Sequence, residues 1–497
     1  MRGGIMAAEK DNEKDYNRRD FLKSVGIGSV SLGFLPLLQN GVTAAEPENK
    51  AKVPVYREKY RPQFHFTPMK NWTNDPNGLV YYKGAYHLFF QHNPSGINWG
   101  NMTWGHAVST DLLHWKQLAN AIEPDELGTI FSGSAVVDWN NTSGFQTGTE
   151  NVLVTFYTAA GKFALPKKPF TQCIAYSNDR GKSWVKYKNN PVIEHIRAEN
   201  RDPKVIWHEP SKTWIMALYL DKNDFVLMSS KNLKEWKKLQ DIVLPGSGEC
   251  PDFFPLAVDG FPGNVRWVFW GANGRYLLGS FDGQKFTPET KAMTSVVGQY
   301  YAAQTYSDIP ASDGRRIQIA WMRKGKFPDM PFNQQMSFPC ELKLRKFDEG
   351  IRLCLTPVKE IELLRNYCYD RSGKVVKPGD NILSDVSGEL FEIQAEVEPV
   401  DNAVVGFMIR GVEITYNSRE KVLKCGHKDT KLKKVKGRIK LHILIDRVSI
   451  EVFANDGKAS LFWCSPRFAN NSLEFFARGG SAKVHKMKVW RLNSVWS

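Results

Sequence analysis

The amino-acid sequence predicts an all-β fold, a five-bladed β-propeller followed by a C-terminal β-sandwich. Three observations support this fold class. A serine, a tight polar turn and then an aromatic residue recur in the first part of the chain. Short runs of β-branched and aromatic residues separate these repeats. Beyond about residue 370 the repeat stops, whereas alternating strand patterns continue.

The repeat predicts the blades of the propeller. Its copies follow one another at roughly 50 to 70 residues, and they run from Ser109 to Trp115, Ser177 to Trp184, Ser230 to Trp236 and Ser280 to Phe286. The segments 86–90, 152–157, 214–219 and 317–321 have the length and composition of strands. Units of about 50 residues with about four strands are typical of propeller blades. A last unit ending near Leu344 completes the five blades, which we place within residues 55–358. A single β-sandwich with coincidental turns is the alternative.

The remainder of the chain, residues 370–497, is predicted to be a separate antiparallel β-sandwich. Alternating apolar and polar residues at 390–397 and 449–453 indicate strands with one buried face. The sequence Asn-Asp-Gly at 455–457 is a signal for a hairpin turn. The stretch from Val358 to Leu364 would connect this domain to the propeller.

The first 45 residues are predicted to be a bacterial twin-arginine signal peptide. Arg18 and Arg19 lie in the segment 17–23, a weakly apolar stretch follows from Val25 to Leu38, and small residues at 43–45 offer a cleavage site. The apolar stretch is shorter than the ~18 residues that span a bilayer, so we expect no integral membrane segment in the mature chain. The protein would then be exported, to a periplasm or out of the cell. A chance arginine pair ahead of a buried helix is the alternative.

Composition narrows the function classes further. The formal net charge of +15 invites a nucleic-acid hypothesis. However, the densest basic segment, 431–438, resembles neither a recognition helix nor a stacking platform, so we interpret it as a solvated strand and turn and expect no nucleic-acid partner. The 7 cysteines contain no C-x-x-C pair, which argues against a structural zinc site. We expect no metal and no cofactor, and the oligomeric state stays open.

Three acidic motifs carry the predicted chemistry. They are Asn74-Asp75-Pro76, Arg201-Asp202-Pro203 and Glu249-Cys250-Pro251, and each stands at the start of a candidate innermost strand. Because the innermost strands of a propeller line its axis, their leading ends converge on one funnel, and residues far apart in the sequence can meet there. Each motif alone is weak, since an Asp-Pro pair is usually a turn.

Three carboxyl groups in one pocket suit the cleavage of a glycosidic bond. Cleavage with retention of configuration needs two carboxyl groups ~5–5.5 Å apart, one as nucleophile and one as acid/base. The third can grip sugar hydroxyls as the ring flattens toward an oxocarbenium ion. Crowded carboxylates repel one another, so one of them is expected to keep its proton near neutral pH and to supply the general acid.

These motifs resemble those of glycoside hydrolase family 32, the family of invertases, levanases and inulinases. The resemblance runs through the whole mature chain and implies a five-bladed propeller followed by a β-sandwich. It implies that Asp75 is the nucleophile, that Asp202 binds fructosyl hydroxyls in the transition state, and that Glu249 is the acid/base. Similar stretches around further residues imply a substrate-binding set of Trp72, Asn74, Gln91, Trp99, Phe131, Ser132, Arg201, Tyr301 and Trp321.

Three functional hypotheses follow. The first is a retaining, exo-acting β-fructosidase that releases fructose from fructans such as levan and inulin, or from sucrose. The second is a fructosyltransferase with the same catalytic residues, in which a sugar instead of water accepts the fructosyl group. The third is a non-catalytic carbohydrate-binding protein, which would be expected to lack at least one of the three acids.

Overall fold

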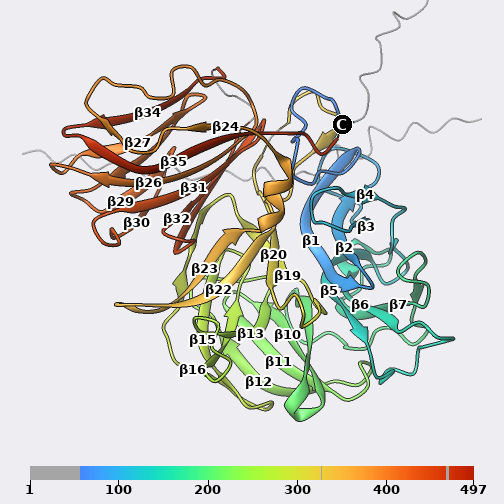
Figure 1. Ribbon diagram of the computed structural model, residues 1–497. Helices are drawn as coiled ribbons and strands as arrows, with labels where there is room; N and C mark the ends of the chain where they lie inside the picture. The colour runs from blue at the N-terminus through green and yellow to red at the C-terminus, as the bar shows by residue number, and fades with distance from the viewer. Residues whose placement is uncertain (1–55, 326, 466–469, 497) are drawn as a thin grey trace, which may run out of the picture. The chain divides into compact units, whose positions relative to one another are not determined.

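The computed structural model describes residues 56–325, 327–465 and 470–496. Nearly all regular structure in these ranges is β-strand, and the helices are short 3-10 turns (Figure 1). The helices are η1 (Gly161–Phe163), η2 (Glu209–Ser211) and η3 (Lys359–Leu364). No helix in the described ranges has the length and apolar character needed to cross a membrane. The predicted signal peptide at 1–45 lies outside the described residues.

Five antiparallel sheets follow one another along the first part of the chain. The first contains β1 (Asn71–Tyr82), β2 (Ala85–Asn93), β3 (Thr103–Ser109) and β4 (Lys116–Gln117). The second contains β5 (Thr129–Asp138), β6 (Val152–Ala160), β7 (Phe170–Ser177) and β8 (Val185–Lys186). The third contains β9 (Arg201–His208), β10 (Thr213–Asp221), β11 (Asp224–Ser230) and β12 (Lys237–Val243). The fourth contains β13 (Asp252–Ala257), β14 (Val265–Trp270), β15 (Arg275–Phe281), β16 (Phe286–Pro288) and β17 (Met293–Thr294). The fifth contains β19 (Tyr301–Thr305), β20 (Arg316–Trp321), β22 (Cys340–Phe347) and β23 (Gly350–Pro357).

The five sheets surround one axis and form a propeller. The first strands β1, β5, β9, β13 and β19 contact one another in that order, and β19 also contacts β1, so the ring is closed. A short strand from the last unit, β21 (Phe332–Asn333), pairs in parallel with the start of β1 and ties the two ends of the ring together. The predicted fold class is confirmed, and the number of sheets agrees with the predicted number of blades.

The repeat found in the sequence corresponds to a turn that follows the third strand of a blade. In the first three blades the serine hydroxyl bonds the polar side chain two residues later, in the pairs Ser109–Asp111, Ser177–Asp179 and Ser230–Asn232. The indole N–H of the tryptophan donates to a backbone carbonyl three residues earlier, at 3.0 to 3.1 Å. In the fourth copy Asp282 accepts backbone N–H groups instead. The motif therefore marks a hydrogen-bonded turn whose aromatic residue covers the blade.

The C-terminal part is a sandwich of two sheets that follows helix η3 (Figure 1). One sheet contains β24 (Arg365–Asp370), β25 (Lys374–Val376), β26 (Phe391–Pro399), β31 (Ile439–Ile445), β32 (Ser449–Ala454), β33 (Ala459–Cys464) and β35 (Ala482–Leu492). The other contains β27 (Val404–Ile409), β28 (Val412–Asn417), β29 (Val422–Cys425), β30 (Lys428–Lys431) and β34 (Leu473–Arg478). Buried side chains such as Ile393, Phe407, Val452 and Phe475 fill the space between them. Because β24 pairs with β35, the sandwich sheet begins at Arg365, ahead of the expected start at 370.

One strand belongs to both parts of the molecule. Strand β18 (Val296–Gly298), which precedes the fifth blade, pairs in parallel with β33 and extends the sandwich sheet. Gly298 has a φ of +102, and a Cβ atom there would lie 2.2 Å from the backbone oxygen of Phe462. Only glycine permits this approach. The strand that leads into Tyr301 is thus held by the sandwich, which the sequence pattern did not predict.

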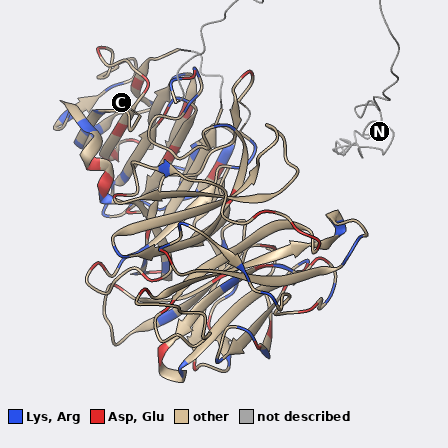
Figure 2. Cartoon of the chain, turned by 90° about the vertical axis from the view of Figure 1, so that its right-hand side faces the viewer, with Lys and Arg blue, Asp and Glu red and all other residues tan. Residues whose placement is uncertain are grey.

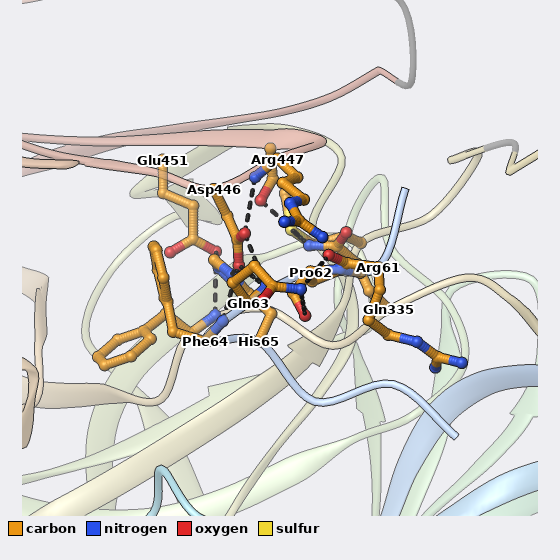
Figure 3. Close-up of polar contacts among 12 residues, drawn as sticks. Arg61, Pro62, Gln63, Phe64, His65, Gln335, Asp446, Arg447 and Glu451 are labelled. Carbon is orange, nitrogen blue, oxygen red and sulfur yellow. Dashed lines mark hydrogen bonds and ion pairs between the residues drawn. The ribbon is translucent and has the colours of Figure 1, made fainter. Parts of the chain in front are cut away.

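A buried polar cluster provides a second connection between the propeller and the sandwich (Figure 3). His65, which precedes β1, places Nδ1 2.8 Å from Oδ2 of Asp446 and Nε2 3.5 Å from Oε1 of Glu451. Asp446 also accepts the backbone N–H groups of Gln63 and Phe64, at 2.8 and 3.0 Å. All three ionisable side chains are completely buried. We call the set His65, Asp446 and Glu451 the interdomain latch.

Charged residues of both signs occur on the propeller and on the sandwich (Figure 2). The basic segment 431–438 begins at Lys431, the last residue of β30, and Lys433, Lys434 and Lys436 are exposed there. This agrees with the interpretation as a solvated strand and turn. All seven cysteines lie in the described part and are free thiols.

Candidate active site

A cavity of about 330 Å³ brings the predicted catalytic residues together. Each of the five innermost strands contributes a side chain to its wall, either from the strand or from the residues just before it: Asp75 (β1), Ser132 (β5), Asp202 (β9), Glu249 (ahead of β13) and Tyr301 (β19). Residues far apart in the sequence therefore share one pocket, as the propeller topology required.

β-Bulges direct these side chains into the cavity. Asn74 and Asp75 together oppose Gln91 between the paired residues of β1 and β2. Comparable irregularities occur at Ser132 in β5, at Asp202 in β9 and just after Tyr301 in β19. A bulge adds a residue to one strand and re-aims its side chain, and bulges are common beside active sites. Four of the five innermost strands use this device where they reach the pocket.

Backbone strain also occurs at the pocket. Asp202, Glu249 and Cys250 have φ values of 65, 58 and 38, in the left-handed region that non-glycine residues rarely adopt. Such conformations cost of order 1–3 kcal/mol each and persist where the surrounding structure holds them. Two of the three acids, Asp202 and Glu249, therefore have a strained backbone conformation.

Asp75 is held by two hydrogen bonds from neutral donors. The Ser132 hydroxyl donates to Oδ2 at 2.6 Å, and the Asn74 amide donates to Oδ1 at 3.0 Å. Asn74 is itself oriented by the indole N–H of Trp72, which donates to its Oδ1 at 2.7 Å. Burial raises the pKa of Asp75, and the hydrogen bonds from Ser132 and Asn74 only partly oppose that rise. These hydrogen bonds hold the Asp75 carboxylate in one orientation.

Cys250 links Asp75 to Asp202. Its sulfur lies 3.6 Å from Oδ2 of Asp75 and 3.4 Å from Oδ2 of Asp202. The separation of these two carboxylate oxygens therefore cannot exceed the sum of the two sulfur–oxygen distances. The backbone N–H of Cys250 also donates to Asp202 at 2.9 Å. Burial and the neighbouring carboxylates raise the pKa of the Cys250 thiol, which therefore keeps its proton as a donor.

Each carboxylate oxygen of Glu249 has a side-chain hydrogen-bond donor, one cationic and one a hydroxyl. Arg201 reaches its Oε1 at 2.5 Å, and the Tyr301 hydroxyl donates to its Oε2. Burial raises the pKa of Glu249, but Tyr301, Arg201 and Arg323 outweigh burial and lower it overall. The guanidinium of Arg201 also lies over the ring of Tyr219, 4.7 Å from its centroid.

The pKa values of Asp202 and of the expected general acid Glu249 are shifted in opposite directions. Burial, together with the charges of Glu249 and Asp75, raises the pKa of Asp202 to about 7, although Arg201 opposes this. Between these two acids, the protonated form is therefore favoured at Asp202 and the ionised form at Glu249. The physical reason is that Arg201 and Tyr301 stabilise the ionised form of Glu249, whereas burial of Asp202 disfavours its charge.

Most of the predicted substrate-binding residues line the cavity. They are Asn74, Gln91, Trp99, Phe131, Ser132, Arg201, Tyr301 and Trp321. Trp72 stands behind this wall, where its ring meets that of Trp321 edge-on at 6.2 Å. The cavity also contains residues that motif reading did not assign, namely Lys162, Glu199, Cys250 and Arg323. Only Cys250 was visible beforehand, as part of the Glu-Cys-Pro motif.

An exposed aromatic cluster stands at the rim. Trp99 is 48% exposed and meets Phe131 and Phe163 at ring distances of 6.0 and 5.7 Å. Phe163 comes from helix η1, which no motif in the sequence indicated. Aromatic faces of this kind offer stacking surface to the C–H faces of sugars. Several carboxyl groups in a cavity of the size of a sugar, with aromatic residues at its rim, are typical of a glycoside hydrolase.

Comparison with known proteins agrees with this class. Residues 65–357 match the glycosyl hydrolases family 32 N-terminal domain, and residues 360–491 match the glycosyl hydrolases family 32 C-terminal domain. A levanase of Bacillus subtilis is 41% identical, in an alignment that covers 92% of this chain and 74% of the levanase. An extracellular exo-inulinase of Aspergillus niger is 31% identical, over 89% of this chain and 96% of the inulinase.

The fold of a solved relative is also similar. The crystal structure of an exo-inulinase from Aspergillus awamori superposes with a TM-score of 0.79 at 28% sequence identity, and the match covers 89% of this chain and 100% of that one. The protein described here belongs to glycoside hydrolase family 32.

Proposed function

We propose that the protein is a retaining, exo-acting β-fructosidase that releases fructose from the ends of fructan chains, with Asp75 as nucleophile and Glu249 as acid/base. The observation that carries this proposal is the single cavity in which Asp75, Asp202 and Glu249 meet. The similarity to a levanase and to exo-inulinases points to a β-fructan as substrate. The pocket is small, about 330 Å³, which suits a terminal sugar unit.

The proposed reaction has two steps. A carboxylate oxygen of Asp75 attacks the anomeric carbon of the terminal fructosyl unit, and the bond to the leaving oxygen breaks as Glu249 gives that oxygen a proton. Glu249, now ionised, then takes a proton from a water molecule. The water oxygen attacks the same carbon and releases fructose, which restores the Asp75 carboxylate. Two inversions at one carbon give net retention.

Substrate binding would supply Glu249 with its proton. Sugar hydroxyls that donate to Asp202 would favour the ionised form of this acid, and a sugar that covers Glu249 would disfavour its charge. The proton present in the site near neutral pH would then move from Asp202 to Glu249. The three acids titrate as a coupled group, so their apparent pKa values belong to the group.

Replacement of the two proposed catalytic carboxylates tests this assignment. Asp75→Asn and Glu249→Gln keep the shape of each side chain and remove its charge, so each variant should lose at least about 4 kcal/mol of barrier lowering, a thousandfold fall in kcat. Initial rates of fructose release from levan, inulin and sucrose would be measured in parallel.

Two exposed carboxylates outside the cavity serve as matched controls. Asp241→Asn and Glu235→Gln change the same chemical groups on the surface of the third blade and should leave the rates unchanged. Wild-type rates in both Asp75→Asn and Glu249→Gln would rule out the assigned roles. Product chains longer than the donor at high sucrose concentration would show transfer to a sugar, the alternative reaction, in place of hydrolysis.

We further propose that the chain is exported through the twin-arginine pathway. The pair Arg18-Arg19 and the apolar stretch that follows motivate this route, and the relatives include an extracellular exo-inulinase. Changing both arginines to lysine keeps the charge and should retain the protein inside the producing cell. Unchanged export of this variant would contradict the route.

A further inference from the structure

A buried charged network lies on the innermost strands that also hold the catalytic acids of the third and fourth blades. Lys204 lies in β9, two residues beyond Asp202, and Asp252 is the first residue of β13, three residues beyond Glu249. Thr305 is the last residue of β19. We call the set Lys204, Asp252 and Thr305 the inner-strand network. Each member comes from a different blade of the propeller.

The members of the inner-strand network contact one another directly. The Lys204 ammonium donates to the backbone carbonyl of Thr305 at 2.5 Å and lies 3.7 Å from Oδ2 of Asp252. The same carboxylate oxygen accepts the backbone N–H of Thr305 at 2.6 Å, and Oδ1 of Asp252 accepts the N–H of Phe253 at 2.8 Å. Two charged side chains therefore join strands that belong to three separate sheets.

The charges of the network are shielded from water. The side chain of Lys204 is 3% exposed, and that of Asp252 is fully buried. Burial lowers the pKa of Lys204, and the charge of Asp252 opposes this shift, whereas Arg316 and Asp308 of the fifth blade act on Lys204 with opposite signs. A buried ion pair adds little stability when compared with apolar side chains of similar volume. We therefore expect its effect in the orientation of the strands that it joins.

The segment from Glu249 to Asp252 depends on support of this kind. Glu249 and Cys250 adopt left-handed φ values, which persist where the surrounding structure holds them. Asp252 ends this segment, and its carboxylate ties the segment to β19 through the N–H of Thr305. Strand β19 begins at Tyr301, whose hydroxyl donates to Glu249. Release of Asp252 would therefore disturb Glu249 both through its own backbone and through Tyr301.

We propose that Lys204 and Asp252 are positioning residues for the reaction, which hold the Glu249 carboxylate against the Tyr301 hydroxyl and keep the acid/base group aligned with the bond that breaks. This inference rests on the proposed function, in which Glu249 is the acid/base. Neither Lys204 nor Asp252 is among the described residues that line the catalytic cavity. Both would therefore act without touching the substrate.

Two variants test this role through their kinetics. Asp252→Asn removes the charge and keeps the shape of the side chain, and Lys204→Met combined with Asp252→Asn removes both charges, so that no buried cation is left without a counter-ion. A misplacement of about 1 Å can cost on the order of a hundredfold in rate. We expect kcat to fall by about tenfold to a hundredfold in each variant, with KM within about twofold of the wild-type value.

The pH profile separates positioning from a general loss of structure. The hydrogen bond from Tyr301 lowers the pKa of Glu249, so its loss should move the basic limb of the kcat/KM profile to higher pH. Adding Asp252→Asn to Tyr301→Phe should move this limb no further than Tyr301→Phe alone, because both changes remove the same contact. The other ionisable groups that interact with Glu249 are the same in these variants: Arg201, Tyr219, Arg323, Asp75, Asp202 and Cys250.

A buried ion pair in the sandwich provides the matched control. Arg365→Met combined with Glu392→Gln removes one cation and one buried carboxylate that pair at 2.7 Å. This control should keep the wild-type kcat, KM and pH profile. A basic limb at the wild-type position in both network variants, additive shifts with Tyr301→Phe, or an equal shift in the control would overturn the proposal.

Crystal structures of the wild type, the double network variant and the control give a readout that needs no turnover. The hydrogen bond between Tyr301 and Glu249 should be lost in the network variant and kept in the control. An intact bond in the network variant would overturn the proposal, whether or not the wild type hydrolyses a fructan. A lost bond in the variant together with a wild type that releases no fructose would instead refute the proposed function alone.

Discussion

Replacing His65 tests how strongly the interdomain latch holds the propeller and the sandwich together. Burial lowers the pKa of His65, but the charge of Glu451 and the hydrogen bond to Asp446 outweigh burial and raise the pKa to about 9 from 6.5. The folded protein therefore binds a proton at His65 that the unfolded chain releases above about pH 6.5. A rise of this size corresponds to about 3 kcal/mol of stability.

The sign of the pH dependence follows from the raised pKa. The contribution of His65 is fully present below pH 6.5 and is lost as the pH rises through about 9. The variant His65→Gln cannot carry the proton and leaves two buried carboxylates without a cation. At pH 6 its free energy of unfolding should be about 3 kcal/mol lower than that of the wild type. This difference in the free energy of unfolding should decrease toward pH 10.

Denaturant unfolding followed by tryptophan fluorescence at pH 6, 8 and 10 measures both effects. The control is His114→Gln, because His114 forms an exposed ion pair with Asp111 at 2.7 Å. An exposed pair contributes about 0–1 kcal/mol, so this variant should follow the wild type at every pH. If His65→Gln were as stable as the wild type at pH 6, or kept the same deficit at pH 10, the argument for a charged latch would be wrong.

Further predictions concern the site and the sandwich. Gly133→Ala should abolish activity or folding, because the added methyl would lie 1.8 Å from a backbone oxygen of the next strand; circular dichroism separates the two outcomes. Arg323→Met should shift the basic limb of the kcat/KM profile to higher pH, because Arg323 lowers the pKa of Glu249; an unmoved limb would contradict this. Arg365→Met removes the guanidinium that pairs with the buried Glu392 and leaves it only His442 as a basic partner. It should cost about 3 kcal/mol in thermal unfolding, whereas wild-type stability would show that the pair contributes little.

The parts of the fold that could be predicted are those with a local signal. The repeated Ser-to-Trp turn is stabilised within seven or eight residues, so it leaves a trace in the sequence wherever a blade turns. The three acids could be placed in one pocket because the ring topology fixes where each innermost strand begins. The hairpin at 455–457 was visible for the same local reason: Asn455 and Asp456 both adopt positive φ.

The parts that could not be predicted depend on contacts between distant segments. The sequence of β18 (Val296–Gly298) does not indicate that this strand pairs in parallel with β33, because backbone hydrogen bonds decide the pairing. Phe163 reaches the rim from a helix that no motif indicated. Arg323 reaches the cavity wall from just beyond the stretch around Trp321, which did not assign it. The lowered pKa of Glu249 was also inaccessible, because it depends on Arg201 and Tyr301 both reaching this carboxylate in three dimensions.

The pairing of β18 with β33 limits how this protein could be recombined with its relatives. A chimera joined near residue 358 would take the two partners of a parallel strand pair from different parents. A mismatch of even one residue in their alignment would be transmitted along three residues of chain to Tyr301, and from there to the carboxylate that it holds. The smallest exchangeable C-terminal module therefore includes a tripeptide that lies far upstream, inside the other domain.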